Sequence, residues 1–129
     1  MNPTGYSGKP LIDKLGFAPG DSILLSSSPD WYAVFVADNA LTSRLTTPTT
    51  HAHIFCSNLA DLETFLATNK LTQVEKSIWF SWPKKSSGIS TDITEQTFRD
   101  HILPLGWVDT KVAAIDETWS GLKFLRRKT

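Results

Sequence analysis

Short apolar runs alternate with amphipathic segments along this chain, and the alternation predicts an α/β fold. Three runs are short and apolar enough to be strands buried on both faces: SILLS, AHIFCS and KSIWFSW. Each is followed by a segment with helical character. The clearest of these, NLADLETFLATNK, places Leu59, Leu62, Phe65 and Leu66 on one face. Strands that alternate with helices are typical of a mostly parallel sheet.

Turn and capping residues predict where these elements end. A short helix near the N-terminus is expected to stop at Gly16. Ser28 is the expected N-cap of the helix after the first strand, with Pro29 at its first position. In DITE, Asp92 is the expected N-cap of a later helix and Glu95 its third residue.

The C-terminal part predicts an antiparallel hairpin: the strand WVDTKVAAIDE, the tight turn TWSG and the strand LKFLRRK. With a period of two, Asp109 and Lys111 are expected on one face of the sheet and Asp116 on the other. That arrangement separates the acids rather than pairing them for acid–base chemistry. Asp116 is expected to serve the turn, and Trp119 to cover the sheet edge.

The expected architecture is a single Rossmann-like, three-layer α/β domain over residues 9–129, preceded by a flexible N-terminus over residues 1–8. A mostly parallel sheet of five to six strands, with SRLTT as a short edge strand, ends in the antiparallel C-terminal hairpin. The C-terminal strand, helix and hairpin also look like the second half of a Rossmann-like methyltransferase.

Charge and composition exclude several functions. Thirteen basic and thirteen acidic residues cancel, so no global field attracts nucleic acid or an anionic membrane. No apolar run approaches the roughly 20 residues that span a bilayer, and the start has no secretion signal, so we expect a cytoplasmic protein. Cys56 is alone, and His51 with His53 would leave a metal short of ligands, so no metal site is expected.

A nucleotide cofactor is not expected either. A Rossmann cofactor site needs glycines directly after the first strand and an acidic residue that closes the second. LLSSSPDW has no glycine, and RLTTPTT has no acid, so neither S-adenosylmethionine nor a dinucleotide is expected to bind. The ends of these strands are still expected to form a crevice, lined by Ser26, Ser27, Ser28, Ser57 and Asn58. An enzyme of this fold would have to use that crevice.

The stretch SWPKKSSGISTDITE is the main candidate for a ligand site. It would lie at the carboxyl ends of parallel strands, where ligands usually bind, just before the positive end of a helix. Lysines and hydroxyls there suit a phosphate or carboxylate, and the candidate contacts are Lys84, Lys85, Ser86, Ser87, Ser90 and Thr91. A purely structural connection explains the same residues, and the two carboxylates of DITE count against an anion.

Three stretches resemble a family of short bacterial proteins catalogued only as a domain of unknown function: YSGKPLIDKLGFAPG, IWFSWPKKSSGISTDITE and GWVDTKVAAIDETWSGLKF. The resemblance runs from about Tyr6 to the end of the chain. It implies a cytoplasmic α/β protein with no assigned activity and no catalytic residues to carry over.

The leading interpretation is a non-enzymatic domain with a regulatory or accessory role, which binds a small anionic ligand or a partner protein but neither nucleic acid nor membrane. One alternative is a reduced methyltransferase-like enzyme that uses the serine crevice. Another is a structural homodimer that pairs through an exposed sheet edge or its tryptophans. Whether the chain is a monomer or a homodimer stays open.

Overall fold

Six strands form one mixed sheet in the computed structural model, which describes residues 9–127. The order is β2-β1-β3-β4-β6-β5; the strands from β2 to β4 are parallel, and β6 is antiparallel to both its neighbours. Their bounds are β1 Ser22–Ser26, β2 Thr42–Arg44, β3 Thr49–Phe55, β4 Val74–Pro83, β5 Trp107–Ala114 and β6 Trp119–Arg126. The predicted mostly parallel sheet with a C-terminal antiparallel hairpin is confirmed. The edge strand predicted at SRLTT lies at Thr42–Arg44 instead and shares only Ser43 and Arg44 with the prediction.

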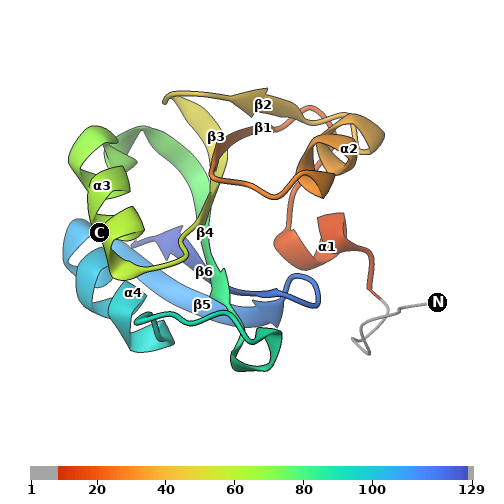
Figure 1. The fold of residues 1–129 in the computed structure, drawn as a ribbon. Coiled ribbons are helices and arrows are strands. Elements are labelled where there is room, and N and C mark those ends of the chain that lie inside the picture. The colour runs from red at the N-terminus through yellow and green to blue at the C-terminus, as the bar shows by residue number, and fades with distance from the viewer. Residues whose placement is uncertain (1–8, 128–129) are drawn as a thin grey trace.

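Helices cover both faces of this sheet and make three layers (Figure 1). On one face lie α1 Leu11–Leu15 and α2 Trp31–Asp38; on the other lie α3 Leu59–Thr68 and α4 Glu95–Ile102. Within the described residues no helix is long and apolar enough to cross a membrane. The segment predicted to be flexible, residues 1–8, lies outside the part of the chain that the structure describes.

The two hydrophobic layers are supplied by alternate side chains of the same strands, as the pleat of a strand requires. In β4, Phe80 packs into the α3–α4 layer, where its ring stacks on Phe98 at 5.2 Å and meets Phe124 edge-on at 5.8 Å. Its neighbour Trp79 enters the other layer, and its indole N–H donates to the carbonyl of Leu15 at 2.9 Å. β4 therefore joins the two cores.

The ends of the first two helices agree only in part with the prediction. α1 stops at Gly16, whose φ of 80° is the left-handed conformation expected of a helix-ending glycine. α2 begins at Trp31, and Asp30 rather than Ser28 stands at the N-cap position, without a capping side chain. The prediction for Ser28 and Pro29 is wrong because the chain is still turning there after β1.

The cap of α4 also differs from the prediction. Thr94 is the N-cap residue, and its backbone N–H donates to Oγ1 of Thr97 at 3.1 Å, so α4 begins at Glu95. Asp92 instead accepts the backbone N–H of Leu59, at the start of α3, at 2.8 Å. Asp92 was predicted to cap its own helix and in fact caps a different one, a contact between segments 33 residues apart.

A β-bulge overturns the predicted faces of the hairpin acids. The register of β5 against β6 shifts between Asp109 and Lys111, so Thr110 is an extra residue and the alternation is broken. Asp109 reaches Arg99 of α4 at 2.9 Å, whereas the ammonium of Lys111 donates to the carbonyl of Lys14 in α1 at 2.9 Å. The two side chains therefore lie on opposite faces, contrary to the prediction.

The turn of the hairpin lies at residues 115–118, before the predicted TWSG. One oxygen of Asp116 accepts the backbone N–H groups of Thr118 and Trp119, both at 2.8 Å, so this acid does serve the turn. Trp119 already belongs to β6, and its ring meets Phe55 edge-on at 5.0 Å. It packs into the α1–α2 layer rather than covering the sheet edge.

Gly121 in β6 has no room for a side chain. A Cβ there would lie 2.9 Å from Cδ1 of Ile115 and 3.0 Å from Cε3 of Trp79. Gly121→Ala is therefore expected to lower the free energy of unfolding by about 1–3 kcal/mol through overpacking. Ile115→Val removes the nearest methyl group, so the double variant should lose less than the two single variants together. Urea unfolding of all four proteins measures this, and strict additivity would contradict it.

Candidate functional site

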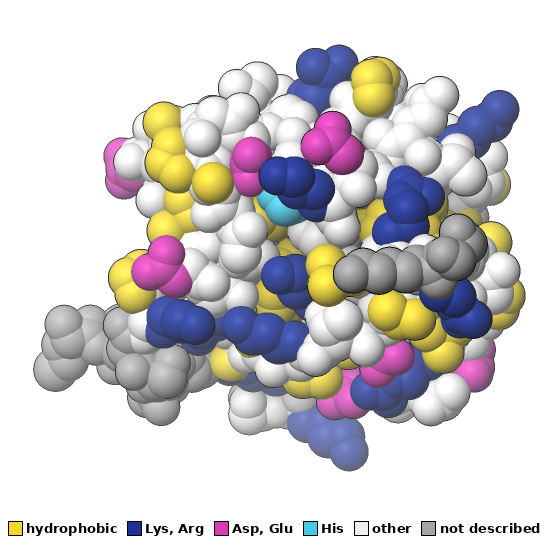
Figure 2. All heavy atoms as spheres, turned by 180° about the vertical axis from the view of Figure 1, so that it is seen from behind, with side chains coloured by type: hydrophobic (Ala, Val, Ile, Leu, Met, Phe, Trp, Pro, Cys, Tyr) yellow, Lys and Arg dark blue, Asp and Glu magenta, His cyan; other side chains and the backbone are white. Residues whose placement is uncertain are grey.

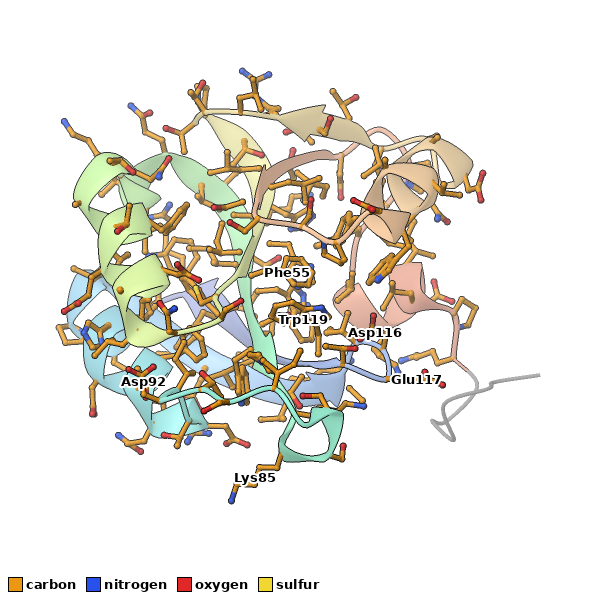
Figure 3. The ribbon with its side chains drawn as sticks, viewed as in Figure 1. Phe55, Lys85, Asp92, Asp116, Glu117 and Trp119 are labelled. Carbon is orange, nitrogen blue, oxygen red and sulfur yellow. The ribbon has the colours of Figure 1, made fainter. Side chains whose placement is uncertain are left out.

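The candidate loop lies where the sequence places it, at the end of β4 on the carboxyl edge of the parallel strands. The backbone N–H of Lys84 donates to the carbonyl of Thr118 at 2.8 Å, which ties the loop to the hairpin turn. Lys85–Ser87 form one 3₁₀ turn, ended by Gly88 with a φ of 78°. In Figure 3 the side chain of Lys85 points away from the body of the protein.

Some of the loop hydroxyls have structural partners. Oγ of Ser87 donates to the carbonyl of Lys84 at 2.6 Å and accepts the N–H of Ile89 at 3.1 Å. Oγ1 of Thr91 accepts the N–H of Ile93 at 3.1 Å. These bonds shape the loop, so its conformation does not depend on a ligand.

A groove of about 590 Å³ lies between this loop, the start of α4 and β6. It is within the usual size range of small-molecule sites. Apolar and polar groups both contribute to its lining: Trp82, Pro83, Lys84, Lys85, Thr91, Ile93, Thr94, Glu95, Gln96, Arg99 and Ser120. Of the six candidate contacts, Lys84, Lys85 and Thr91 line the groove, and Ser86, Ser87 and Ser90 do not.

Arg99 is the cation of the groove that contacts two carboxylates. Its Nε donates to Asp109 and its Nη2 donates to Glu95, both at 2.9 Å. The hydrogen bond to Asp109, and to a smaller extent that to Glu95, raises the pKa of the guanidinium. The charge of Glu95 is compensated by the same contact. Sequence reasoning missed Arg99; the i,i+4 spacing from Glu95 signals the pair, but not the groove beside it.

The serine crevice is not one site. Ser26 and Ser27 line a hollow of about 200 Å³ beside α3, whereas Ser28 lines a separate hollow of about 340 Å³ beside α2 and β2. Ser57 and Asn58 line neither. The structure therefore does not bring the five residues of the predicted crevice together.

The start of α3 is occupied by the protein's own side chains. Asn58 Oδ1 accepts the N–H of Asp61 at 2.9 Å, and Oδ2 of Asp61 reaches back to the N–H of Ser57 at 2.9 Å. Asp92 adds a second carboxylate on the N–H of Leu59. Two carboxylates at this helix end disfavour binding of another anion there.

A buried Asp–His–Ser chain lies at the opposite, amino end of the parallel strands. Nε2 of His51 lies 2.8 Å from Oδ2 of Asp21, and Nδ1 lies 2.6 Å from Oγ of Ser77. Burial lowers the pKa of His51, and the hydrogen bond that the imidazole donates to Asp21 opposes this shift. The composition is that of a nucleophilic triad, but Ser77 is only 2% exposed, so no substrate can reach its hydroxyl.

His53 has two neutral partners. Its Nδ1 lies 2.7 Å from the hydroxyl of Tyr32 and its Nε2 lies 2.7 Å from that of Ser81. Burial lowers the pKa of His53 to about 3. Cys56 packs in the α3–α4 layer. In the described part of the chain, no three His, Cys, Asp or Glu residues are placed to hold a metal ion.

Lysines also gather around the end of α1. The ammonium of Lys14 donates to the carbonyl of Ala114 at 3.2 Å, and Lys111 donates to the carbonyl of Lys14. Burial is the larger cause that lowers the pKa of both Lys14 and Lys123, and the nearby charge of Lys111 lowers both further. On the face drawn in Figure 2, Lys and Arg side chains are spread among acidic ones. These lysines hold α1 on the hairpin, since cations stabilise a helix C-terminus.

The fold is that of Rossmann-like α/β proteins. A protein of the NADB-Rossmann superfamily from Streptococcus agalactiae shares it with a TM-score of 0.59 and 10% sequence identity, over 96% of this chain and 71% of that one. TrmK of M. capricolum in complex with S-adenosyl-homocysteine shares it with a TM-score of 0.56 and 7% identity, over 92% of this chain and 68% of that one. Magnesium protoporphyrin IX methyltransferase from Synechocystis with bound SAM has a TM-score of 0.53 and 12% identity, over 90% of this chain and 74% of that one. At these identities the likeness shows the fold alone.

The chain belongs to the family DUF8412, a domain of unknown function, whose model matches residues 54–129. The matched stretch holds α3 to β6 with the loop and the groove, whereas β1, α2 and β2 lie outside it. The predicted membership in a domain of unknown function is thereby confirmed for residues 54–129, whereas the resemblance predicted from about Tyr6 extends beyond the matched residues. Comparison with curated proteins finds no match in sequence.

The cofactor of the two methyltransferase structures does not fit the equivalent edge of this sheet. Directly after β1, Ser27 has a φ of 55°, a conformation that favours glycine, and it carries a side chain where a Rossmann site needs bare backbone. β2 closes on Arg44, a basic residue where an acid would hold a ribose.

Proposed function

We propose that this protein is a non-enzymatic domain that binds a small anionic ligand in the groove after β4. The observation that carries the proposal is a groove lined by Lys84, Lys85 and Arg99 beside Trp82 and Ile93. Lys84, Lys85 and Arg99 outnumber Glu95 and Asp109, the two acids paired with Arg99, so the local charge is positive although the whole chain is neutral. The first turn of α4 adds the partial positive charge of a helix N-terminus.

The lining also suggests the shape of the ligand. One part of the groove is apolar, with Trp82, Pro83 and Ile93, and suits a flat or aliphatic group. Lys85 is exposed and can turn toward a carboxylate or phosphate, while Arg99 is held in place by its two acids. A small molecule with an apolar body and one anionic group matches this arrangement.

A regulatory or accessory role follows from the chemistry of the lining. The one acid among the lining residues, Glu95, is paired with Arg99, and the lining includes no histidine or cysteine. Neither a free general base nor an activated nucleophile is thus offered to a bound molecule. We place the protein in the bacterial cytoplasm as part of the same proposal, with a partner protein as the alternative occupant of the loop.

A thermal-shift screen with sugar phosphates, nucleotides, aromatic carboxylates and S-adenosylmethionine tests the proposal. Anionic compounds with an apolar part are expected to raise the melting temperature, since they bind the native state. Lys85→Ala should weaken their binding about tenfold, through loss of one charge-assisted contact. Lys70→Ala, an exposed lysine after α3, serves as the matched control.

Two outcomes would overturn the proposal. The first is that no anionic compound changes the melting temperature of the wild-type protein. The second is a shift with S-adenosylmethionine that Lys85→Ala leaves intact, because that result would favour the methyltransferase-like alternative at the other strand ends.

A further inference from the structure

The groove after β4 has a negatively charged part as well as its lysines. Arg99 contacts two carboxylates, Oδ2 of Asp109 and Oε2 of Glu95, both at 2.9 Å. At neutral pH two carboxylates and one guanidinium leave this trio of side chains with a single negative charge. The trio therefore attracts a cation rather than a second anion.

Glu95 is the acid of the trio that a bound molecule can reach. It lines the groove, and 41% of its side chain is exposed, against 28% for Arg99. Its Oε2 accepts from Arg99, whereas its Oε1 accepts no hydrogen bond from residues 9–127. A carboxylate oxygen is thus open to a donor of a ligand.

The lysines lie at a different level of the sheet from the trio. Asp109 pairs with Phe124 of β6, and Phe124 pairs with Ile78 of β4. Lys84 follows Pro83, which is the last residue of β4. From Ile78 to Pro83 the strand rises about 16 Å, at about 3.3 Å per residue. The positive and the negative parts of the groove are therefore separated along the strands.

An apolar surface completes the groove. Trp82 lies in β4 between these two levels, and Ile93 lines the groove with it. The groove thus offers cations, an apolar surface and an accessible carboxylate to one molecule.

We propose that the ligand of the groove is a zwitterion with an apolar body between its two charges. Its anionic group binds Lys84 and Lys85, its body lies on Trp82, and its cationic group donates to Glu95. This inference rests on the proposed function and adds the cationic group to it. A short peptide with free ends has this chemistry, because the length of its chain separates the ammonium from the carboxylate.

Titration calorimetry at pH 7 with two forms of the tripeptide Ala-Phe-Ala tests the inference. This peptide is roughly 10 Å long when extended and carries an apolar side chain in its middle. One form has both ends free, and the other is acetylated at its N-terminus and keeps only the carboxylate. The free form is expected to bind about three- to fivefold more tightly, which is the gain that an exposed ion pair allows.

Four variants assign this difference to the trio. Glu95→Gln should abolish it, because the carboxylate that meets the ammonium is neutralised. Asp109→Asn should reduce it although Asp109 does not line the groove, because the trio loses its net charge. Lys85→Ala should weaken both peptides alike, since both carry the carboxylate. Glu63→Gln, at an exposed position of α3, is the matched control and should keep the difference.

The inference is overturned if acetylation leaves the affinity for the wild-type protein unchanged, or if the free peptide does not bind. It is equally overturned if Glu95→Gln and Asp109→Asn both keep the difference, since the ammonium would then bind elsewhere. An acetylated peptide that binds as tightly as the free one, and does so through Lys85, would sink this inference and still support the proposed function. The screen of anionic compounds judges the proposed function separately.

Discussion

Lowering the pH from about 7 to about 4.5 is expected to reduce the free energy of unfolding by about 2.5 kcal/mol through His53 alone. The pKa of this buried imidazole falls from its ordinary value of 6.5 to about 3 in the folded protein. Between these values the unfolded chain binds a proton that the folded chain does not. The contribution of His53 is therefore fully present above the unfolded pKa and is lost as the pH falls below it.

The lowered pKa of His51 acts in the same direction, since burial also disfavours its charged form. Urea unfolding followed by tryptophan fluorescence across this pH range measures the combined loss. His53→Gln removes the titrating group and should flatten the pH dependence by about 2.5 kcal/mol, even if the variant is less stable at neutral pH.

Tyr32→Phe is the matched control, because it removes a hydrogen-bond partner of His53 but keeps the imidazole buried. It should lower stability at every pH and keep the wild-type slope, since burial is the cause of the shift. A stability that stays constant to about pH 4.5, or a His53→Gln variant with an unchanged slope, would show that the imidazole is not buried in its neutral form.

Trp79→Phe is expected to cost about 2–4 kcal/mol of stability, as the sum of lost packing and one orphaned carbonyl. Trp79 is fully buried, and its indole N–H is the partner of the Leu15 carbonyl at the end of α1. A phenylalanine leaves a void in the α1–α2 layer and no donor for that carbonyl. Guanidinium unfolding measures the loss, and hydrogen exchange in α1 should quicken.

Trp82→Phe provides the comparison, because Trp82 is also buried and packs on Phe98 in the other layer. It should cost less, about 1–2 kcal/mol, and should leave hydrogen exchange in α1 unchanged. If both variants lose the same stability and α1 is equally protected in both, the hydrogen bond from Trp79 does not hold α1 on the sheet.

The loop after β4 illustrates how far sequence reasoning reaches toward a site. A buried apolar run followed by a helical pattern places Lys84 and Lys85 at a strand end, and parallel strands share that edge. The groove itself needed Arg99 from α4 and Ser120 from β6. These residues come from segments whose approach depends on strand order and register, so no local pattern signals them.

The serines after β1 show the opposite case. Ser26, Ser27 and Ser28 are adjacent in sequence, and a strand end is a reasonable place for a crevice. The left-handed turn at Ser27 divides them between two hollows. A non-glycine residue at positive φ is uncommon, so composition alone predicts no such turn there.

Hydrophobic periodicity predicts most of the strands and helices, because it is a local property of the chain. Which polar groups meet depends on the tertiary structure. Asp92 caps α3 because that helix end lies beside it, and Asp109 faces Arg99 because an unpaired Thr110 reverses the alternation of β5. Such contacts depend on register and on the approach of distant segments, and a one-residue shift in a strand is enough to exchange its faces.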